Sequence, residues 1–486
     1  MTGNSLPKQF VAGSVAFILL IPVGIYFGNY IFSIVALLFF IFYFLLTGYD
    51  KLYYFIVVST PLSIGLDEIF KNLSFNISLP SEILMILLLF VLIVQLLSKR
   101  LFSPKIFLHP ISIAVLIYLF WIFITSLTSS MPLVSLKFLI ARLWFVLPLF
   151  FFPILLFKRQ KNIQLFFGLY IAAFSIVIIY SIKKHLAFGL FDKQASHFVM
   201  QPFYNDHTSY GAILAMYIPI LAGLMFIKNL TTFRKTIILL LLVLFSLALL
   251  LSYTRAAWIS IVAVFMLAIL IWLKLKLRYI FLMSAVAISL LFVYRSEIID
   301  KLNKNKQDSS AEISEHIKSI SNIATDASNL ERINRWNAAL KMFRERPVFG
   351  WGPGTYMFQY APFQMAKDKT IISTNFGTAG NAHSEYIGPL VEQGIPGLFS
   401  ILLLVGTIIY TALKVYYSAN NNQVKILSFI GLLSLSTYFI HGLLNNFLDT
   451  DKAAVPFWGI IAMLVSLDIY QLDENKNPQP GEAEER

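Results

Sequence analysis

Long apolar runs recur along this chain, and they constrain its fold more than any other feature. Runs of about 18 or more apolar residues occur in both halves, each long enough to cross a hydrocarbon core of about 30 Å as a helix. Hydrophobic residues make up 58% of the chain and charged residues only 13%. A soluble domain could not bury that much apolar surface. The sequence therefore predicts an all-α polytopic membrane protein.

We expect about 12 to 14 transmembrane helices. The first run follows Lys8, but no small-residue cleavage pattern comes after it, so we interpret it as a helix rather than a signal peptide. The third run is short. The candidate spans begin near Phe10, Tyr30, Leu52, Ser81, Pro110, Val134, Gln164, Thr208, Lys235, Ala256, Tyr279, Ile395, Lys425 and Ala453.

The connecting loops alternate in charge, which predicts the orientation of the chain. Lysine and arginine gather in alternate loops, at residues 99–105, 158–161, 228–235 and 274–278. The positive-inside rule makes these loops cytoplasmic. An even number of spans then leaves both termini in the cytoplasm. We expect a multi-pass protein of the bacterial inner membrane.

One long polar segment breaks this pattern, and we expect function to be located there. Residues 295–394 are mixed in charge and far longer than the other links, and the alternation makes them periplasmic. The predicted division is 1–182 for the N-terminal helices, 183–294 for central helices with a small periplasmic loop, 295–394 for the long catalytic loop, 395–470 for the C-terminal helices, and 471–486 for a disordered cytoplasmic tail.

Several chemistries are excluded or disfavoured by composition and motif. The chain has no cysteine, so thiolate nucleophiles and Cys-ligated metals are excluded. Its histidines form no metal-binding pattern, and the glycines of residues 350–354 lack the ending of a phosphate-binding P-loop. The net charge of +13 falls mostly in short loops, so it does not indicate nucleic-acid binding. We expect no metal and no cofactor.

Within the long loop, residues 326–346 are predicted to form a helix. Asp326 or Ser328 can cap it and Pro347 ends it. Apolar residues recur at helical spacing at Leu330, Ile333, Leu340 and Phe343. Arg332, Arg335 and Trp336 then share one side. On such a helix, charged residues usually form a solvated face, which is the alternative to a functional role.

Two more charged or titratable residues flank apolar runs. Arg255 lies in Ser252 to Trp258 at the external junction of two spans, where an arginine can simply extend its side chain to the interface. His383 precedes a segment rich in Gly and Pro that leads into the next span. Alone, such a histidine is more often a structural hydrogen-bonding group than a base.

Together these residues suit one chemistry. A diphosphate leaving group needs its growing charge neutralised, and the forked, always-charged arginine does this without a metal. A sugar hydroxyl that attacks an anomeric carbon needs a proton acceptor, which histidine provides near neutral pH.

The smaller external loop ends in polar residues at the mouth of a span. Asn205 and Asp206 are expected to cap that helix. A second interpretation makes Asn205, His207 and Tyr210 substrate contacts.

At these positions the sequence resembles the O-antigen ligase and polymerase family. The matching stretches are Ser252 to Trp258, Arg332 to Trp336 with Arg346 to Tyr356, and His383 to Gly397 with its Glu-x-Gly-Ile-Pro-Gly ending. Ala256 stands where the family often has Gly, and Ser384 where Asn commonly follows the His.

The resemblance implies a metal-independent, inverting glycosyl transfer from an undecaprenyl-diphosphate-linked glycan, onto a lipid A-core sugar in a ligase. It implies that Arg255 and Arg332 hold the diphosphate, with Arg335 as a helper, and that His383 is the general base. It also implies a helical membrane bundle capped by periplasmic helices. A polymerase with the same donor is the nearest alternative, and a polysaccharide flippase a remoter one.

Overall fold

A computed structural model describes residues 48–66, 77–98, 102–228, 230–273, 330–366, 369, 373 and 380–472. The spans expected near Phe10, Tyr30 and Tyr279 lie outside these residues, as do the start of the predicted loop helix and the C-terminal tail.

Nine helices of the described part are long and apolar enough to cross a membrane. They are α7 (Pro110–Leu127), α8 (Pro132–Leu156), α9 (Gln160–Leu186), α10 (His207–Leu224), α11 (Thr232–Leu251), α12 (Arg255–Trp272), α17 (Ile387–Ser418), α18 (Asn422–His441) and α19 (Asp451–Ser466), which continues as the π-helical η5 (Leu467–Gln471). Each coincides with a predicted span. The all-α polytopic fold is therefore confirmed.

The described part contains further elements beside these nine helices. The helix α3 (Tyr49–Ser59) has only 11 residues, which agrees with the short third run. The remainder are η1 (Thr60–Leu62), a two-stranded antiparallel hairpin of β1 (Ile64–Gly65) and β2 (Ser78–Leu79), α5 (Ser81–Ser98), α6 (Pro104–Phe107), η2 (Ala195–His197), α16 (Tyr356–Gln359) and η3 (Ala361–Phe363).

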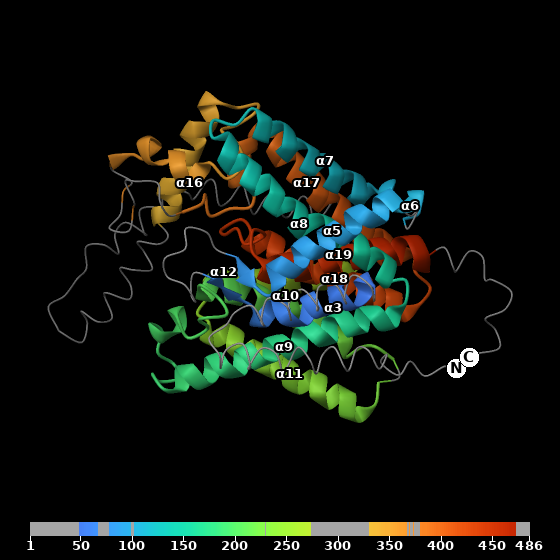
Figure 1. The fold of residues 1–486 in the computed structure, drawn as a ribbon. Helices are drawn as coiled ribbons and strands as arrows, with labels where there is room; N and C mark the ends of the chain where they lie inside the picture. Colours follow the sequence, from blue (N-terminus) through green and yellow to red (C-terminus); the bar gives the residue numbers. More distant parts are fainter. Residues whose placement is uncertain are drawn as a thin grey trace, which may run out of the picture.

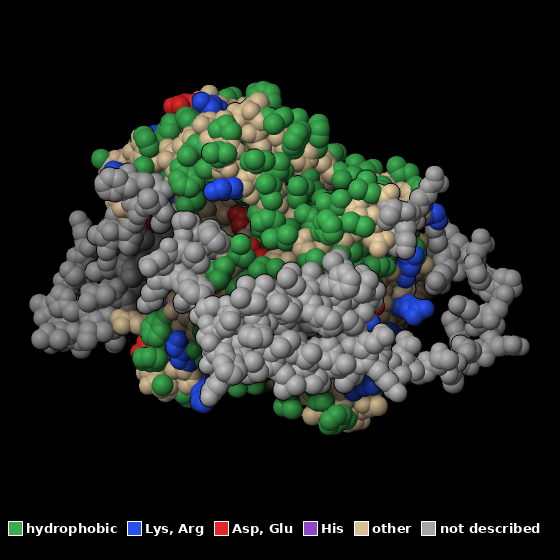
Figure 2. Space-filling view, viewed as in Figure 1, with side chains coloured by type: hydrophobic (Ala, Val, Ile, Leu, Met, Phe, Trp, Pro, Cys, Tyr) green, Lys and Arg blue, Asp and Glu red, His purple; other side chains and the backbone are tan. Residues whose placement is uncertain are grey.

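The helices pack side by side as one bundle, with α7 against α17, α8 against α19 and α10 against α18 (Figure 1). The helix α19 is buried along its whole length and lies at the centre. On the outside, side chains such as Leu240 and Phe265 are 63% and 67% exposed. Hydrophobic side chains cover much of the described surface in Figure 2, as expected for helices that face lipid.

The two ends of the bundle differ. Residues 330–366 and 380–393, here named the cap, lie at one end, beyond the ends of α7 and α8 in Figure 1. The α7–α8 connection is bonded to the cap, since the Ser130 amide donates to the Trp351 carbonyl at 3.0 Å. The lysines and arginines of residues 102–105, 158–161 and 228–235 lie at the other end, where α7, α9 and α11 begin.

The cap is built around a helix at residues 330–345, which agrees with the predicted element within the described residues. It packs through Ala338 and Met342 onto Tyr356 and Tyr360. Leu340, which belongs to the apolar spacing noted in the sequence, is 44% exposed. The buried face instead carries Glu331, Asn334 and Arg335.

A glycine turn ties the cap helix to α17. Gly350 and Gly352 have φ of 68° and 113°, which only glycine adopts easily. A Cβ on Gly350 would lie 2.3 Å from the carbonyl carbon of Glu392. Glu392 in turn accepts hydrogen bonds from the amides of Gly354 and Tyr356 at 2.9 and 3.0 Å.

The helix α17 is kinked at Gly394, while the division expected between residues 394 and 395 stays a prediction. Gly394 has φ 72° and ψ −168°, which is not helical, so the first turns of α17 belong to the cap and the rest to the bundle. A Cβ on Gly394 would lie 2.0 Å from the Val348 carbonyl oxygen.

Candidate active site

Arg335 is the best-anchored residue of the site. Its side chain is buried, its Nε donates to Glu331 at 2.9 Å, and its Nη1 donates to the Asn381 carbonyl at 3.2 Å. Glu331 is held further by Ser373 and by Asn334. Although burial raises the pKa of Glu331, the hydrogen bonds from Ser373 and Arg335 bring it below its usual value. Arg335 therefore does not belong to a solvated charged face, which was the alternative interpretation of this helix.

The turn before His383 is shaped around this guanidinium. Gly380 has φ 142°, and a Cβ there would lie 1.9 Å from Nη1 of Arg335. The Trp336 indole donates to the Ala382 carbonyl at 3.0 Å. The cap helix therefore fixes residues 380–383 through two neighbouring side chains.

His383 points its Nε2 at Arg335. Nη1 of Arg335 lies 3.0 Å from Nε2, and because a guanidinium can only donate, Nε2 accepts and the ring proton is on Nδ1. His383 has φ 48°, a conformation uncommon outside glycine and often found at functional sites. Its own amide donates to Oδ1 of Asn381 at 3.0 Å.

Burial, together with the charges of Arg335 and Arg332, lowers the pKa of His383 to about 4. The imidazole is therefore neutral across the physiological range. A neutral ring is the form that a proton acceptor requires.

Arg332 lies one turn before Arg335 and faces the bundle. Its Nη2 is 3.5 Å from Oδ1 of Asn445, at the limit of a hydrogen bond. Burial lowers the pKa of Arg332, Asp206 opposes this shift, and Arg335 adds to it. The group stays charged at neutral pH because the pKa of arginine starts so high.

Some of the residues at the start of α10 line a cavity, and others pack inside the bundle. Asp206 caps the helix as expected, accepting from the amides of Thr208 and Ser209 at 2.7 and 2.8 Å. Asn205 and Asp206 line a cavity described below. The ring of His207 is 4.2 Å from that of His197. Tyr210 is only 3% exposed and packs in the bundle, away from that cavity.

Arg255 is exposed and begins α12. The preceding Thr254 donates through Oγ1 to the His207 carbonyl at 2.8 Å. A Cβ on Gly211 would lie 2.6 Å from the same Oγ1 of Thr254. Tyr253 has φ 49°, as unusual for its type as the backbone of His383. The segment thus sits at the mouth of α10.

The sequence analysis missed two buried residues at this end of the bundle. His441 is 1% exposed, and neither of its ring nitrogens has a hydrogen-bond partner among the described residues. The charges of Arg332 and Asp206 both act on it. Asn445 receives Arg332 on its oxygen, while its Nδ2 has no partner in the described part of the chain.

Two cavities, each lined in part by Asn381 of the cap, lie at this end of the bundle. The apolar cavity has about 300 Å³ and contains Arg142, which pairs with Asp449 and lies 4.9 Å from the ring centre of Phe138. The polar cavity has about 620 Å³. Asn381, Asn446 and Asp449 line both. In the described ranges, no three His, Asp or Glu side chains are grouped as a metal site requires.

Comparison with known proteins finds a family match over part of the chain. A family model described as O-antigen ligase matches residues 240–402, about a third of the 486-residue chain. This segment of the chain is similar to the O-antigen ligase family. The matched segment contains Arg255, Arg332, Arg335 and His383, whereas Asn205, His207, Tyr210 and His441 lie outside it.

An uncharacterized protein of Haemophilus influenzae (strain Rd) is 23% identical over 135 residues, which are 28% of this chain and 33% of that protein. The match spans about a third of that relative's length. The nine apolar helices of the described part are those of a multi-pass membrane protein, and residues 240–402 of it are similar to the O-antigen ligase family.

Proposed function

We propose that the protein is an inverting, metal-independent glycosyltransferase that moves a glycan from an undecaprenyl-diphosphate-linked donor onto a lipid A-core sugar. The observation that carries this proposal is the meeting of Arg332, Arg335 and His383 at the cap end of the bundle. These residues lie within the O-antigen ligase-like segment.

Arg332 is the first diphosphate ligand in this proposal. It is partly buried, lies within the O-antigen ligase-like segment, and its Nη2 is 3.5 Å from Oδ1 of Asn445. A phosphate oxygen would bind this forked guanidinium more strongly than an amide oxygen does. Arg255, exposed at the mouth of α10, is the second ligand.

Arg335 is assigned a positioning role that changes when donor binds. Its hydrogen bond occupies the lone pair of His383 Nε2. A phosphate oxygen in reach of Arg335 competes for that N–H, and Nε2 then becomes available to the acceptor hydroxyl. The hydroxyl oxygen attacks the anomeric carbon, its proton passes to Nε2, and the diphosphate leaves with the bonding electrons.

We place the cap in the periplasm and both termini in the cytoplasm of the inner membrane. The basic connections at the far end of the bundle support this orientation, because such loops stay in the cytoplasm. The protein has no cysteine, so single cysteines test it directly. Arg344→Cys on the cap should react with an impermeant maleimide in intact cells, and Arg159→Cys only after permeabilisation. The reverse pattern would overturn the orientation.

The activity is tested with purified protein in vesicles and an undecaprenyl-diphosphate-linked glycan. Adding lipid A-core should yield a glycosylated lipid A-core, and transfer should persist in excess chelator. Elongation of the donor-linked glycan without lipid A-core would identify a polymerase instead. Donor movement across the vesicle membrane without any new glycosidic bond would identify a transporter.

A further inference from the structure

The polar cavity has the size of a ligand site. Its volume of about 620 Å³ lies within the usual range of roughly 300–1,000 Å³. The cavity is lined by residues of the β1–β2 hairpin and of the first halves of α5, α8, α10 and α19. Figure 2 shows acidic side chains deep in a hollow of the face on view, with a lysine or arginine at its rim.

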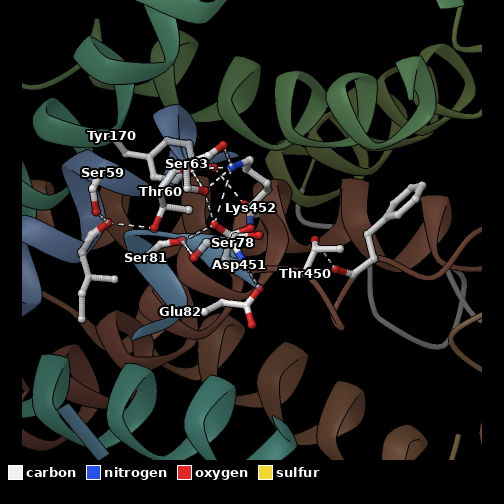
Figure 3. Close-up of polar contacts among 12 residues, drawn as sticks. Ser59, Thr60, Ser63, Ser78, Ser81, Glu82, Tyr170, Thr450, Asp451 and Lys452 are labelled. Carbon is white, nitrogen blue, oxygen red and sulfur yellow. Dashed lines mark hydrogen bonds and ion pairs between the residues drawn. The ribbon is translucent and has the colours of Figure 1, made fainter. Parts of the chain in front are cut away.

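One wall of this cavity is a fixed ion pair (Figure 3). Nζ of Lys452 donates to the carbonyls of Thr60 and Ser63 at 2.8 and 2.7 Å and to the Ser63 hydroxyl. Asp451 accepts from the hydroxyls of Ser63 and Ser81. The three ammonium protons are therefore engaged inside the wall, and the charge of Lys452 is balanced there by Asp451.

Two further carboxylates, Glu82 and Asp206, line the cavity, together with Lys137 of α8. Asp449 also lines it but is paired with Arg142. A phosphorylated group would meet like charges here, which disfavours its binding. The arginines of the cap, in contrast, suit a diphosphate.

Two lining residues also carry buried hydrogen-bonding atoms that pair with nothing in the described part of the chain. Oδ1 of Asn446 and Nε1 of Trp144 have no partner among the described residues. Carboxylates and amides accept or donate to hydroxyls, and an aromatic ring such as Trp144 offers an apolar face to carbon-bound hydrogens. Sugars present both kinds of surface.

We propose that the polar cavity binds an acceptor sugar that carries no phosphate, either uncharged or bearing an amino group. This inference rests on the proposed function, because it names the acceptor of the same site. Two residues join the cavity to the reacting groups. Asp206 lines it and its charge acts on Arg332, while Asn381 lines it and binds both Arg335 and the His383 amide.

The cysteine-free chain allows a binding test that needs no transfer activity. Ala141, on the α8 side of the cavity, is changed to cysteine in the full-length protein and labelled with a small neutral thiol reagent. Glucose, glucosamine and glucose 6-phosphate are the probes. At a sugar concentration about ten times its Kd, labelling should slow about tenfold. The matched control is Ser130→Cys, an exposed position outside the cavity.

Glucose or glucosamine should protect Ala141→Cys and leave Ser130→Cys unaffected, with glucose 6-phosphate giving little protection. Equal protection by glucose 6-phosphate would overturn the charge argument. No protection by any of the sugars, or equal slowing of the control, would overturn the site. If sugars protect but no transfer is ever detected, the proposed function fails and the sugar site stands.

As a second measurement, Glu82→Gln should raise KM for the acceptor about tenfold and leave donor KM unchanged, because Glu82 lies in the cavity and away from the cap arginines. An equal rise in both KM values would indicate a general structural effect and contradict the assignment.

Discussion

Two buried polar groups about ten residues apart, His441 at the end of α18 and Lys452 at the start of α19, differ in one respect. Lys452 is 7% exposed and its ammonium has a partner for each proton. His441 is 1% exposed and neither ring nitrogen has a partner among the described residues. A native protein rarely leaves buried polar atoms unpaired without a reason. We therefore expect a structural role for Lys452, and we expect a substrate group to pair with His441.

The largest effect is expected at His383, which lies at the same end of the bundle as the unpaired His441. His383→Ala should reduce transfer by roughly 10²- to 10⁴-fold, the usual contribution of one general base. Donor binding should persist because Arg332 still holds the diphosphate. Both are measured on vesicle-reconstituted protein, by product formation and by donor titration. A His383→Asn variant that keeps most of the activity would reduce His383 to a hydrogen-bonding role.

Lys452→Met tests the structural role of the fully hydrogen-bonded Lys452. It leaves Asp451 buried without its cation, which should cost about 3–5 kcal/mol of unfolding free energy. Thermal unfolding in detergent and folded yield measure this. Lys414→Met is the control, because Lys414 pairs with Asp468 but is 45% exposed, where such pairs contribute about 0–1 kcal/mol. Similar losses in the two variants would contradict the structural role of the Lys452 pair.

Arg332→Ala should lower transfer about 10²- to 10³-fold, as expected for loss of one donor to a developing negative charge. Arg332→Lys should restore only part of this, since a point charge does not reproduce the guanidinium fork. Arg344→Ala, an exposed position on the same helix, is the control. Wild-type activity in Arg332→Ala would remove it from the site.

The bundle could be predicted from the sequence because membrane spans carry their signal in the chain itself. Each helix from α7 to α12 and from α17 to α19 is a long apolar run. The direction expected from the alternation of basic loops stays a prediction. Lipid supplies no hydrogen-bond partners, so such runs have little choice but to form helices.

The cap was predicted less completely, for a physical reason. Its helix was found, but its buried face carries Glu331 and Arg335, which can be buried because they pair with each other at 2.9 Å. Apolar periodicity cannot reveal such a face. His441 gave no signal either, since a histidine at the end of an apolar run is common. Only the fold shows that it lies near Arg332 and Asp206.

His441→Phe should raise stability and lower activity, whereas Lys452→Met should lower stability. Replacing an unpaired buried imidazole by an apolar ring should raise the unfolding free energy by about 1 kcal/mol, because it removes an unsatisfied polar group. If a substrate group pairs with His441, transfer should fall about tenfold, equivalent to about 1.4 kcal/mol. Loss of stability in His441→Phe would show that the imidazole has a partner in the folded protein.

The smallest expected effect is that of mild acid on the rate. His383 must be neutral to accept a proton, and burial together with Arg335 and Arg332 lowers its pKa to about 4. Transfer at low donor concentration should therefore change little from pH 7 to about 5 and fall only as the pH approaches 4. Between about pH 6.5 and 4 the unfolded chain binds a proton at this residue that the folded chain does not. The unfolding free energy should therefore decrease as the pH falls from about 6.5 to 4. His383→Gln should reduce that decrease. An acid limb near pH 6.5 in kcat/KM would show that the arginines do not lower the pKa of the catalytic imidazole, and would point away from the Arg335–His383 contact.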